Sequence, residues 1–187
     1  MRARNDEEFA KWVLKLGNGD LNMTVDSRSD TVEIPSHFIS SNGVINEIFG
    51  GITEATVQDY ANRAILCPLN DDSFKINSDV LQLLPGEEKV YKSADTIDCA
   101  TGDDNSYYPV EYLNTITPTG MPNHIMNLKV GAIVMLLRNL NTKRGLCNGT
   151  RLIITKLQPN VIFATVLTGR AAGEALFIPR ITLTSSD

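Results

Sequence analysis

The stretch of sequence that decides the fold is LKVGAIVMLLRNLNTKRGLCNGTR, residues 128–151. Its apolar run, residues 132–137, is only six residues long, which favours a buried strand over a helix. Polar residues 141–145 then form a loop, and Asn148-Gly149 is the dipeptide that most readily adopts the positive φ angles of a tight turn. The β-branched residues that follow resume as a strand. The stretch therefore predicts two strands joined by a basic loop and a turn.

The predicted strand pair carries cations and no acid. Its cations are Lys129, Arg138, Lys143, Arg144 and Arg151. Two interpretations stay open, a surface that contacts phosphate groups and an ordinary solvated hairpin. In the first, these five are the candidate contacts to nucleic acid, of which some must point away from any one face, while Asn148 and Gly149 shape the turn that presents them. Neighbours in a strand point to opposite faces, so Lys143 and Arg144, which lie in the loop, are the first candidates.

Length and composition exclude several classes of protein. A chain of 187 residues with 42% hydrophobic content can form one ordinary domain or two small ones. No apolar run approaches the ~20 residues of a membrane span, and charged residues rather than an apolar signal segment follow Met1. Three widely spaced cysteines give neither a disulfide framework nor a zinc spacing. We therefore expect an intracellular protein that is not secreted and has no membrane partner.

Charge is distributed unevenly along the chain. The total is −5, but residues 121–187 hold eight Lys and Arg against two acids, a net charge of +6. The first 120 residues hold nine basic and twenty acidic side chains, a net charge of −11. This asymmetry predicts two parts with different surfaces, of which the second can meet a polyanion. A polar half that faces a partner domain would produce the same asymmetry.

Several elements are predicted before the central stretch. Apolar residues at helical spacing predict helices at 6–16 and 43–49, and a short extended piece is expected at 89–93. The apolar run 64–69 predicts a strand, followed by a polar turn at 70–73 and a helix from Ser73 to Leu84.

The turn after the predicted strand 64–69 has some of the features of a ligand-binding turn, but not all of them. Asn70 and Ser73 lie where a helix amino terminus follows a strand, a place that often binds phosphate in open α/β sheets. The alternative is that Asp71 and Asp72 cap the helix. Capping is favoured, because two acids repel a phosphate group.

Four short strands with tight turns are predicted between residues 129 and 183, which together indicate a small antiparallel barrel. The sequence contains no GxxxxGK[ST] phosphate loop, no paired His and Cys metal set and no GxGxxG unit. Residue patterns alone therefore predict an α/β protein with a basic barrel and assign it no chemistry.

A family resemblance adds to these patterns. The run LKVGAIVMLLRNLNTKRGLCNGTRLIITKL, with FIPRITLT after it, resembles the small barrel in the second motor domain of PIF-type DNA helicases, especially the group that includes Helitron-encoded helicases. Upstream, IPSHFI and ILCPLNDDSFKINSDVLQLLPGEEKVYKSADTI resemble the link between the motor domains and the motif IV region. The resemblance covers nearly the whole chain.

The resemblance implies an α/β fold, in which a partial RecA-like motor layer of the P-loop NTPase type carries an inserted antiparallel β-barrel of the Src-homology type. It divides the chain into residues 1–60, the end of the first motor domain and the link; residues 61–111, the start of the second motor domain; and residues 112–187, the barrel and following strands. Asn70 and Ser73 belong to the motif IV region in this division.

The implied function is that of an ATP-dependent 5′–3′ DNA helicase fragment, active in DNA repair, recombination, telomere maintenance or mobile-element replication. Its compartment is the nucleus, with the mitochondrion as an alternative. Its partners are single-stranded DNA and the missing motor segments. ATP and magnesium are expected only for the full-length family, whose phosphate loop should precede Met1 and whose arginine finger should follow Asp187. This chain is therefore expected to have no catalytic residues, metal or cofactor of its own.

Two other functions stay open. The chain is alternatively a non-catalytic module that binds single-stranded nucleic acid or another protein, or a degenerate mobile-element remnant.

Overall fold

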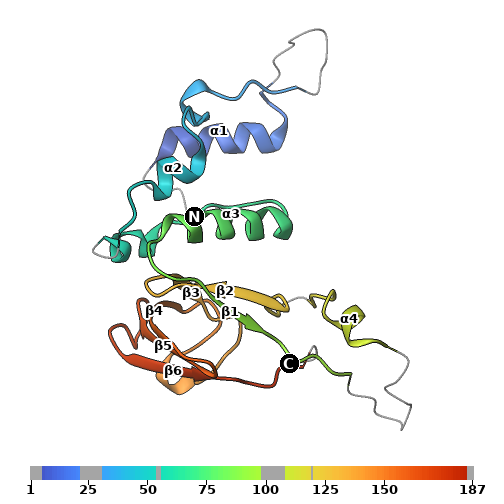
Figure 1. The fold of residues 1–187 in the computed structure, drawn as a ribbon. Helices are drawn as coiled ribbons and strands as arrows, with labels where there is room; N and C mark the ends of the chain where they lie inside the picture. Colours follow the sequence, from blue (N-terminus) through green and yellow to red (C-terminus); the bar gives the residue numbers. More distant parts are fainter. Residues whose placement is uncertain (1–5, 22–30, 54–55, 98–107, 119, 185–187) are drawn as a thin grey trace. The chain divides into compact units, whose positions relative to one another are not determined.

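The computed structural model describes residues 6–21, 31–53, 56–97, 108–118 and 120–184 (Figure 1). The chain divides into two compact units, residues 1–43 and residues 44–187. No helix in the described ranges combines the length and the apolar character that crossing a membrane requires.

The first unit is built on helix α1, Glu7–Asn18, with the short 3₁₀ helix η1, Ser36–Phe38. The helix begins where the Asp6 carboxylate accepts a hydrogen bond from the Phe9 amide at 2.9 Å, and it ends at Gly19 with a φ of 75°. The Trp12 and Phe38 rings lie 5.2 Å apart, so the two helices share an aromatic contact. The predicted helix at residues 6–16 is confirmed.

The second unit begins with three helices: α2, Val44–Phe49, the 3₁₀ helix η2, Val57–Asn62, and α3, Asn70–Leu83. The predicted helix at residues 43–49 is confirmed. The predicted polar turn at residues 70–73 is wrong, because these residues form the first turn of α3. The N-cap residue is Leu69 with no side-chain cap, so the capping alternative for Asp71 and Asp72 is wrong as well. Both acids still complement the partial positive charge of the first helical turn.

The strand predicted at residues 64–69 is also wrong. These residues belong to no strand, and the described part of the chain places no ladder partner beside them. Leu66 is 94% exposed and Leu69 is 63% exposed. An apolar run signals burial, but a strand exists only through hydrogen bonds to a neighbouring strand. Residues 64–69 therefore have the apolar composition of a strand but form no hydrogen-bonded pairing with a described strand.

The strands form two antiparallel sheets. A two-stranded ribbon pairs β1, Lys89–Lys92, with β2, Ile125–Leu128, and a short helix α4, Val110–Leu113, lies between them in sequence. A four-stranded sheet follows in the order β3, β4, β5 and β6. Its strands are Ile133–Met135, Arg151–Leu157, Val161–Val166 and Ala175–Pro179. The extended piece predicted at residues 89–93 is thus confirmed as a paired strand, and β3 occupies only half of the run 132–137.

An α/β fold with antiparallel sheets is therefore confirmed. Among the described strands, β3 pairs with β4 and β6 pairs with β5, and no pairing joins β3 to β6. The described strands therefore form an open four-stranded sheet, and the predicted closure into a barrel is not observed among them. The RecA-like layer and the boundaries at residues 60 and 111 stay predictions.

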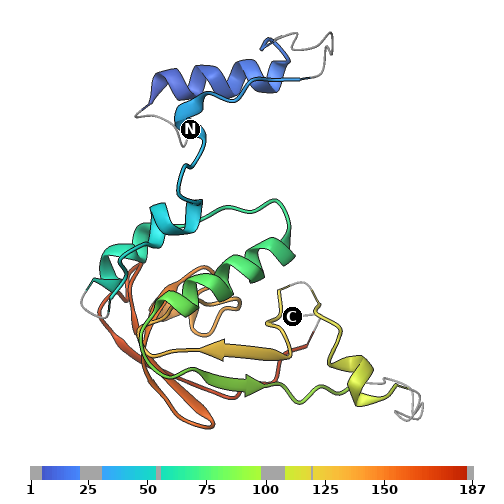
Figure 2. The ribbon, with the colours of Figure 1, turned by 45° about the horizontal axis from the view of Figure 1, so that its top comes forward.

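The core of the second unit has two parts. The helix-side cluster joins the helical segment to the strands, and its buried members are Ile52, Tyr60, Leu84, Leu128, Ala132, Ile153 and Ile154. The loop-side cluster lies within the sheet and its turns, and its buried members are Leu136, Leu146, Leu152, Ala164, Val166 and Ala171. Figures 1 and 2 show α3 beside the β1–β2 ribbon, where Leu81 packs against the helix-side cluster.

Candidate nucleic-acid interface

The loop between β3 and β4 is a rigid element. A single 3₁₀ turn, η4, Thr142–Arg144, begins at Asn141, whose side-chain oxygen accepts a hydrogen bond from the Arg144 amide at 3.2 Å. Gly145 ends it with a φ of 78°. The backbone then pairs Asn141 with Leu146 in an antiparallel bridge. The loop therefore presents Lys143 and Arg144 from a fixed backbone.

The turn that follows is held by backbone bonds to its neighbours. The Gly149 amide donates to the Leu136 carbonyl at 2.8 Å, and the Asn148 amide donates to the Asn139 side-chain oxygen at 2.8 Å. Gly149 has a φ of 87°, which glycine adopts without strain. The predicted role of Asn148 and Gly149 in shaping a tight turn therefore agrees with this geometry.

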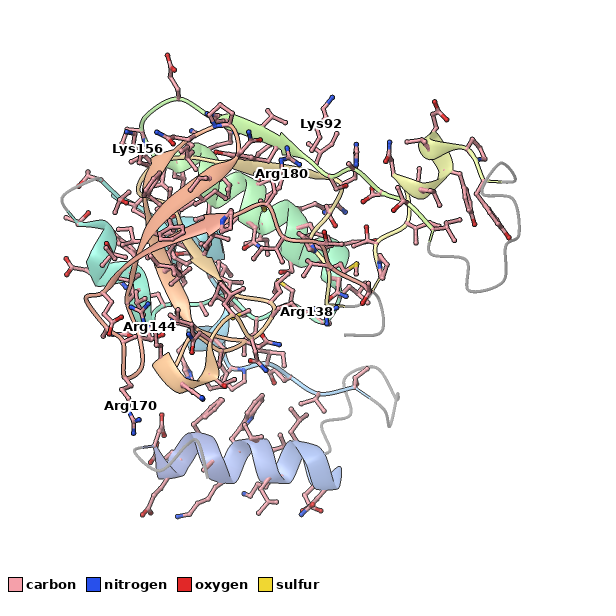
Figure 3. All side chains as sticks on the ribbon, turned by 90° about the horizontal axis from the view of Figure 1, so that it is seen from below. Lys92, Arg138, Arg144, Lys156, Arg170 and Arg180 are labelled. Carbon is pink, nitrogen blue, oxygen red and sulfur yellow. The ribbon has the colours of Figure 1, made fainter. Side chains whose placement is uncertain are left out.

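Three exposed cations gather at this end of the sheet. Lys143 is exposed and makes no hydrogen bond or ion pair with another described residue. Arg144 is exposed and forms an ion pair with Glu174. A β-carbon added to Gly145 would lie 3.6 Å from the β-carbon of Arg170, which places Arg170 beside the loop. We call Lys143, Arg144 and Arg170 the loop surface, and Figure 3 shows Arg144 and Arg170 on adjoining loops.

The other predicted cations are placed differently. Lys129 is 7% exposed, and its amine donates to the Leu84 carbonyl at 2.9 Å. The Arg151 guanidinium donates to the Ala61 carbonyl. Both side chains therefore fasten the helical segment to the strands. Arg138 donates to the Thr184 carbonyl at 3.0 Å, away from the loop surface (Figure 3).

The motif IV candidates lie on α3. Asn70 is exposed and Ser73 is half-buried, and both belong to the first helical turn together with two acids. The Ser73 amide is already bonded to the Leu69 carbonyl at 3.2 Å. This turn offers a partial positive charge from the helix and two full negative charges from the side chains.

A second group of cations was missed by the sequence analysis. Lys92, Lys156 and Arg180 are exposed, and Figure 3 shows them at the end of the unit opposite Arg144 and Arg170. The Arg180 guanidinium donates to the Lys92 carbonyl at 3.0 Å, which joins the end of β6 to the end of β1. Long-range pairing brings these residues together, so no local spacing in the sequence predicts the group.

The structure also brings together Ser93, Asp95 and His124, which the sequence analysis did not connect. The Ser93 hydroxyl lies 2.8 Å from His124 Nδ1 and donates to Asp95 at 2.7 Å, while the same Nδ1 lies 3.3 Å from Asp95. A catalytic relay needs the serine and the acid on opposite nitrogens of the ring. This group is therefore a hydrogen-bonded polar cluster that joins the end of β1 to the start of β2.

One titratable group of the ribbon has a shifted pKa. Burial raises the pKa of Tyr91 above its usual range. Its hydroxyl donates to the Gln158 carbonyl at 2.7 Å, a hydrogen bond that requires the protonated form of Tyr91. In the described part of the chain, no cluster of three or more His, Cys, Asp and Glu side chains is arranged to hold a metal ion.

Comparison with known proteins finds matches among the Pif1 helicases. Residues 111–157 match the model of the 2B domain of DNA helicase Pif1. The resemblance to the PIF-type helicases is confirmed. The ATP-dependent DNA helicase PIF1 of Danio rerio is 33% identical over 94 residues, and that of Xenopus laevis is 36% identical over 93 residues. Each alignment covers 50% of this chain and 13% of the relative, so the chain matches a small part of a Pif1 helicase.

Solved Pif1 structures were also matched. A structure of two coordinating Pif1 helicases at forked double-stranded DNA aligns with a TM-score of 0.43 and 21% identity, over 75% of this chain and 27% of that one. Bacteroides Pif1 bound to single-stranded DNA aligns with a TM-score of 0.39 and 22% identity, over 79% of this chain and 31% of that one. The Pif1 2B match includes η4 and all of β4, so the loop that carries Lys143 and Arg144 lies inside it.

Proposed function

We propose that this chain is a segment of an ATP-dependent 5′–3′ DNA helicase of the PIF type, and that its loop surface contacts the phosphates of single-stranded DNA. The observation that carries the proposal is the placement of Lys143 and Arg144 on a capped, rigid turn inside the Pif1 2B match. A fixed backbone lowers the entropy lost when the side chains are ordered on a ligand.

The charge of the loop surface supports a polyanionic partner. Lys143 and Arg170 are exposed, and the one described acid paired with this surface is Glu174, which neutralises part of the charge of Arg144. Phosphate contacts of this type give affinity without sequence preference. Lys129 and Arg151 are left out of the proposed contact, because each donates to a backbone carbonyl inside the fold.

The exposed apolar side chains of the helical segment favour the interpretation that this chain is part of a larger protein rather than a free-standing module. Leu66 and Leu69, in the extended stretch before α3, are 94% and 63% exposed. Large apolar groups exposed together mark contacts with other protein surfaces. We propose that the remaining motor segments of the helicase cover them, that these segments supply the ATP and magnesium sites, and that the helicase works in the nucleus in DNA repair, recombination, telomere maintenance or mobile-element replication.

The test is a salt titration of single-strand binding. Fluorescence anisotropy of a labelled oligo-dT is measured at several salt concentrations for the parent chain and for the double variant Lys143→Ala, Arg144→Ala. Each lost phosphate contact is expected to reduce the slope of log affinity against log salt by roughly 0.7. Lys75→Ala is the matched control, since Lys75 is an exposed cation on α3 next to acids. Equal affinities and slopes for the parent and the double variant would overturn the proposed contact.

A further inference from the structure

We propose that the outer face of strands β5 and β6 is a second contact for single-stranded nucleic acid, on which bases stack against Phe163 and Phe177. The proposal extends the proposed function to a surface distant from the loop surface. The loop surface is proposed to contact the phosphates, whereas this face is proposed to contact the bases.

The strand register places one aromatic pair and one cation in a row. Phe163 on β5 lies directly opposite Phe177 on β6 and opposite Lys156 on β4. Residues that are directly opposite in an antiparallel pair share a face of the sheet. Lys156, Phe163 and Phe177 therefore form a continuous row across three strands.

A bulge in β4 is what brings Lys156 into this row. The register shifts between Ile154 and Lys156, so Thr155 is an extra residue on the strand. Without the shift, residues 154 and 156 would point to the same face. Ile154 is 1% exposed and points into the core, whereas Lys156 is exposed. The bulge thus redirects a lysine to the aromatic face, which is a recurring use of such irregularities.

The two ends of the row, Lys156 and Phe177, are exposed, and Phe163 between them is half-buried. At the other end of β4, the Arg151 guanidinium reaches the Ala61 carbonyl, so the 3₁₀ helix η2 covers the outer face there. Toward β6 the cover ends, and Phe177 is 66% exposed although it lies in the middle of its strand. A phenylalanine side chain that is so exposed contributes little hydrophobic stabilisation to the fold.

The charge around the row favours nucleic acid over an apolar protein surface. The described residues of the face on β5 and β6 include no acid: they are Val161, Phe163, Thr165, Ala175, Phe177 and Pro179. Arg180 follows β6 about 10 Å along the strand from Phe177, and its guanidinium reaches the Lys92 carbonyl. Figure 3 shows Lys156, Arg180 and Lys92 at this end of the unit. Aromatic rings flanked by cations are the usual platform for unpaired bases.

The test separates stacking from charge in the full chain. Phe177→Ala is expected to weaken oligo-dT binding by about 5- to 150-fold, the range found for lost base stacking, without changing the salt slope. Phe177→Trp is expected to bind as the parent does, and its indole fluorescence is expected to fall when oligo-dT is added. Lys156→Ala is expected to lower the salt slope by roughly 0.7 instead.

Two comparisons keep the result decisive. Tyr112→Ala removes another exposed aromatic group, which lies on α4 beside Glu111, and it is expected to leave binding unchanged. Phe177→Leu keeps the apolar side chain and removes the ring, so a loss of binding in this variant, with an unchanged melting temperature, assigns the effect to stacking. If the parent chain binds and Phe177→Ala binds equally well, the stacking platform is overturned, and the double variant Lys143→Ala, Arg144→Ala decides the loop surface separately. If the parent chain fails to bind, both proposals fall.

Discussion

The four-stranded sheet and the segment from α2 to β1 are held together by different forces. In the sheet, Leu152, Ile154 and Val166 are at most 1% exposed. Leu152 lies directly opposite Val166, and Ile154 lies opposite Ala164, across β4 and β5. In the helical segment, α2 and α3 contain no buried residue. That segment is joined to the strands by the helix-side cluster and by side chains that donate to backbone carbonyls. The sheet is therefore the stable centre of the second unit, and the segment before it is attached to that centre.

The attachments explain why cations that are close in sequence have different roles. Lys129 donates to Leu84 and Arg151 to Ala61, in each case to a main-chain oxygen of the attached segment. A buried carbonyl without a partner costs free energy, so each donor stabilises the contact that it spans. Lys143 has no such bond with a described residue and stays available for a ligand.

The largest expected effect tests the difference in core packing. Leu152→Ala is expected to lower the free energy of unfolding by about 2 to 5 kcal/mol, because Leu152 is fully buried and its loss leaves a cavity. Leu83→Ala makes the same chemical change on α3, where the side chain is 40% exposed, and is expected to cost less than about 1 kcal/mol. Urea denaturation of both variants measures the difference. Equal losses would show that the helical segment is packed as firmly as the sheet.

The same contrast decides how far the sequence could predict the fold. The runs 64–69 and 132–137 have the same length, and the apolar residues of each predict a strand, although the first contains Pro68. Among the described residues only the second has a partner, because the connection 136–150, with its loop at 141–145 and its turn at Asn148-Gly149, returns the chain to residues 133–135. Local pairing of this kind is encoded in the sequence, and so are the α1 and α2 helices. A partner for residues 64–69 is not supplied by any nearby segment.

The candidate site could be predicted in part for the same reason. Lys143 and Arg144 were found because a short loop determines their exposure. Lys129 looked identical in sequence, yet the distant carbonyl of Leu84 decides its burial. The aromatic row could not be predicted, because it depends on the register of three strands and on the bulge at Thr155. A single extra residue reverses which face a side chain occupies, and the residue pattern does not reveal it.

A second prediction sharpens the role of the attachments. Lys129→Met keeps the length of the side chain and removes the donor to Leu84, and it is expected to lower the free energy of unfolding by about 1 to 3 kcal/mol. Lys156→Met changes an exposed lysine in the same way and is expected to stay within about 0.5 kcal/mol of the parent. Urea denaturation is again the measurement. If Lys129→Met left stability unchanged but reduced the salt slope of oligo-dT binding, Lys129 would be a phosphate contact and not an attachment.

The smallest expected effect concerns the ribbon and depends on pH. Tyr91→Phe removes the hydroxyl that donates to Gln158 at the turn between β4 and β5, and it is expected to cost about 0.5 to 1.5 kcal/mol at pH 8. Burial raises the pKa of Tyr91 in the folded chain above its ordinary value of about 10. The stabilisation is therefore complete below pH 10 and is lost as the pH rises from there through the folded pKa, because the unfolded chain releases the proton first. The advantage of the parent over Tyr91→Phe, measured by urea denaturation from pH 8 to pH 11, should shrink over the upper end of that range. A difference that stayed constant with pH would mean that the hydroxyl is not held in its protonated form, and the ribbon would then depend on apolar packing in the same way as the sheet.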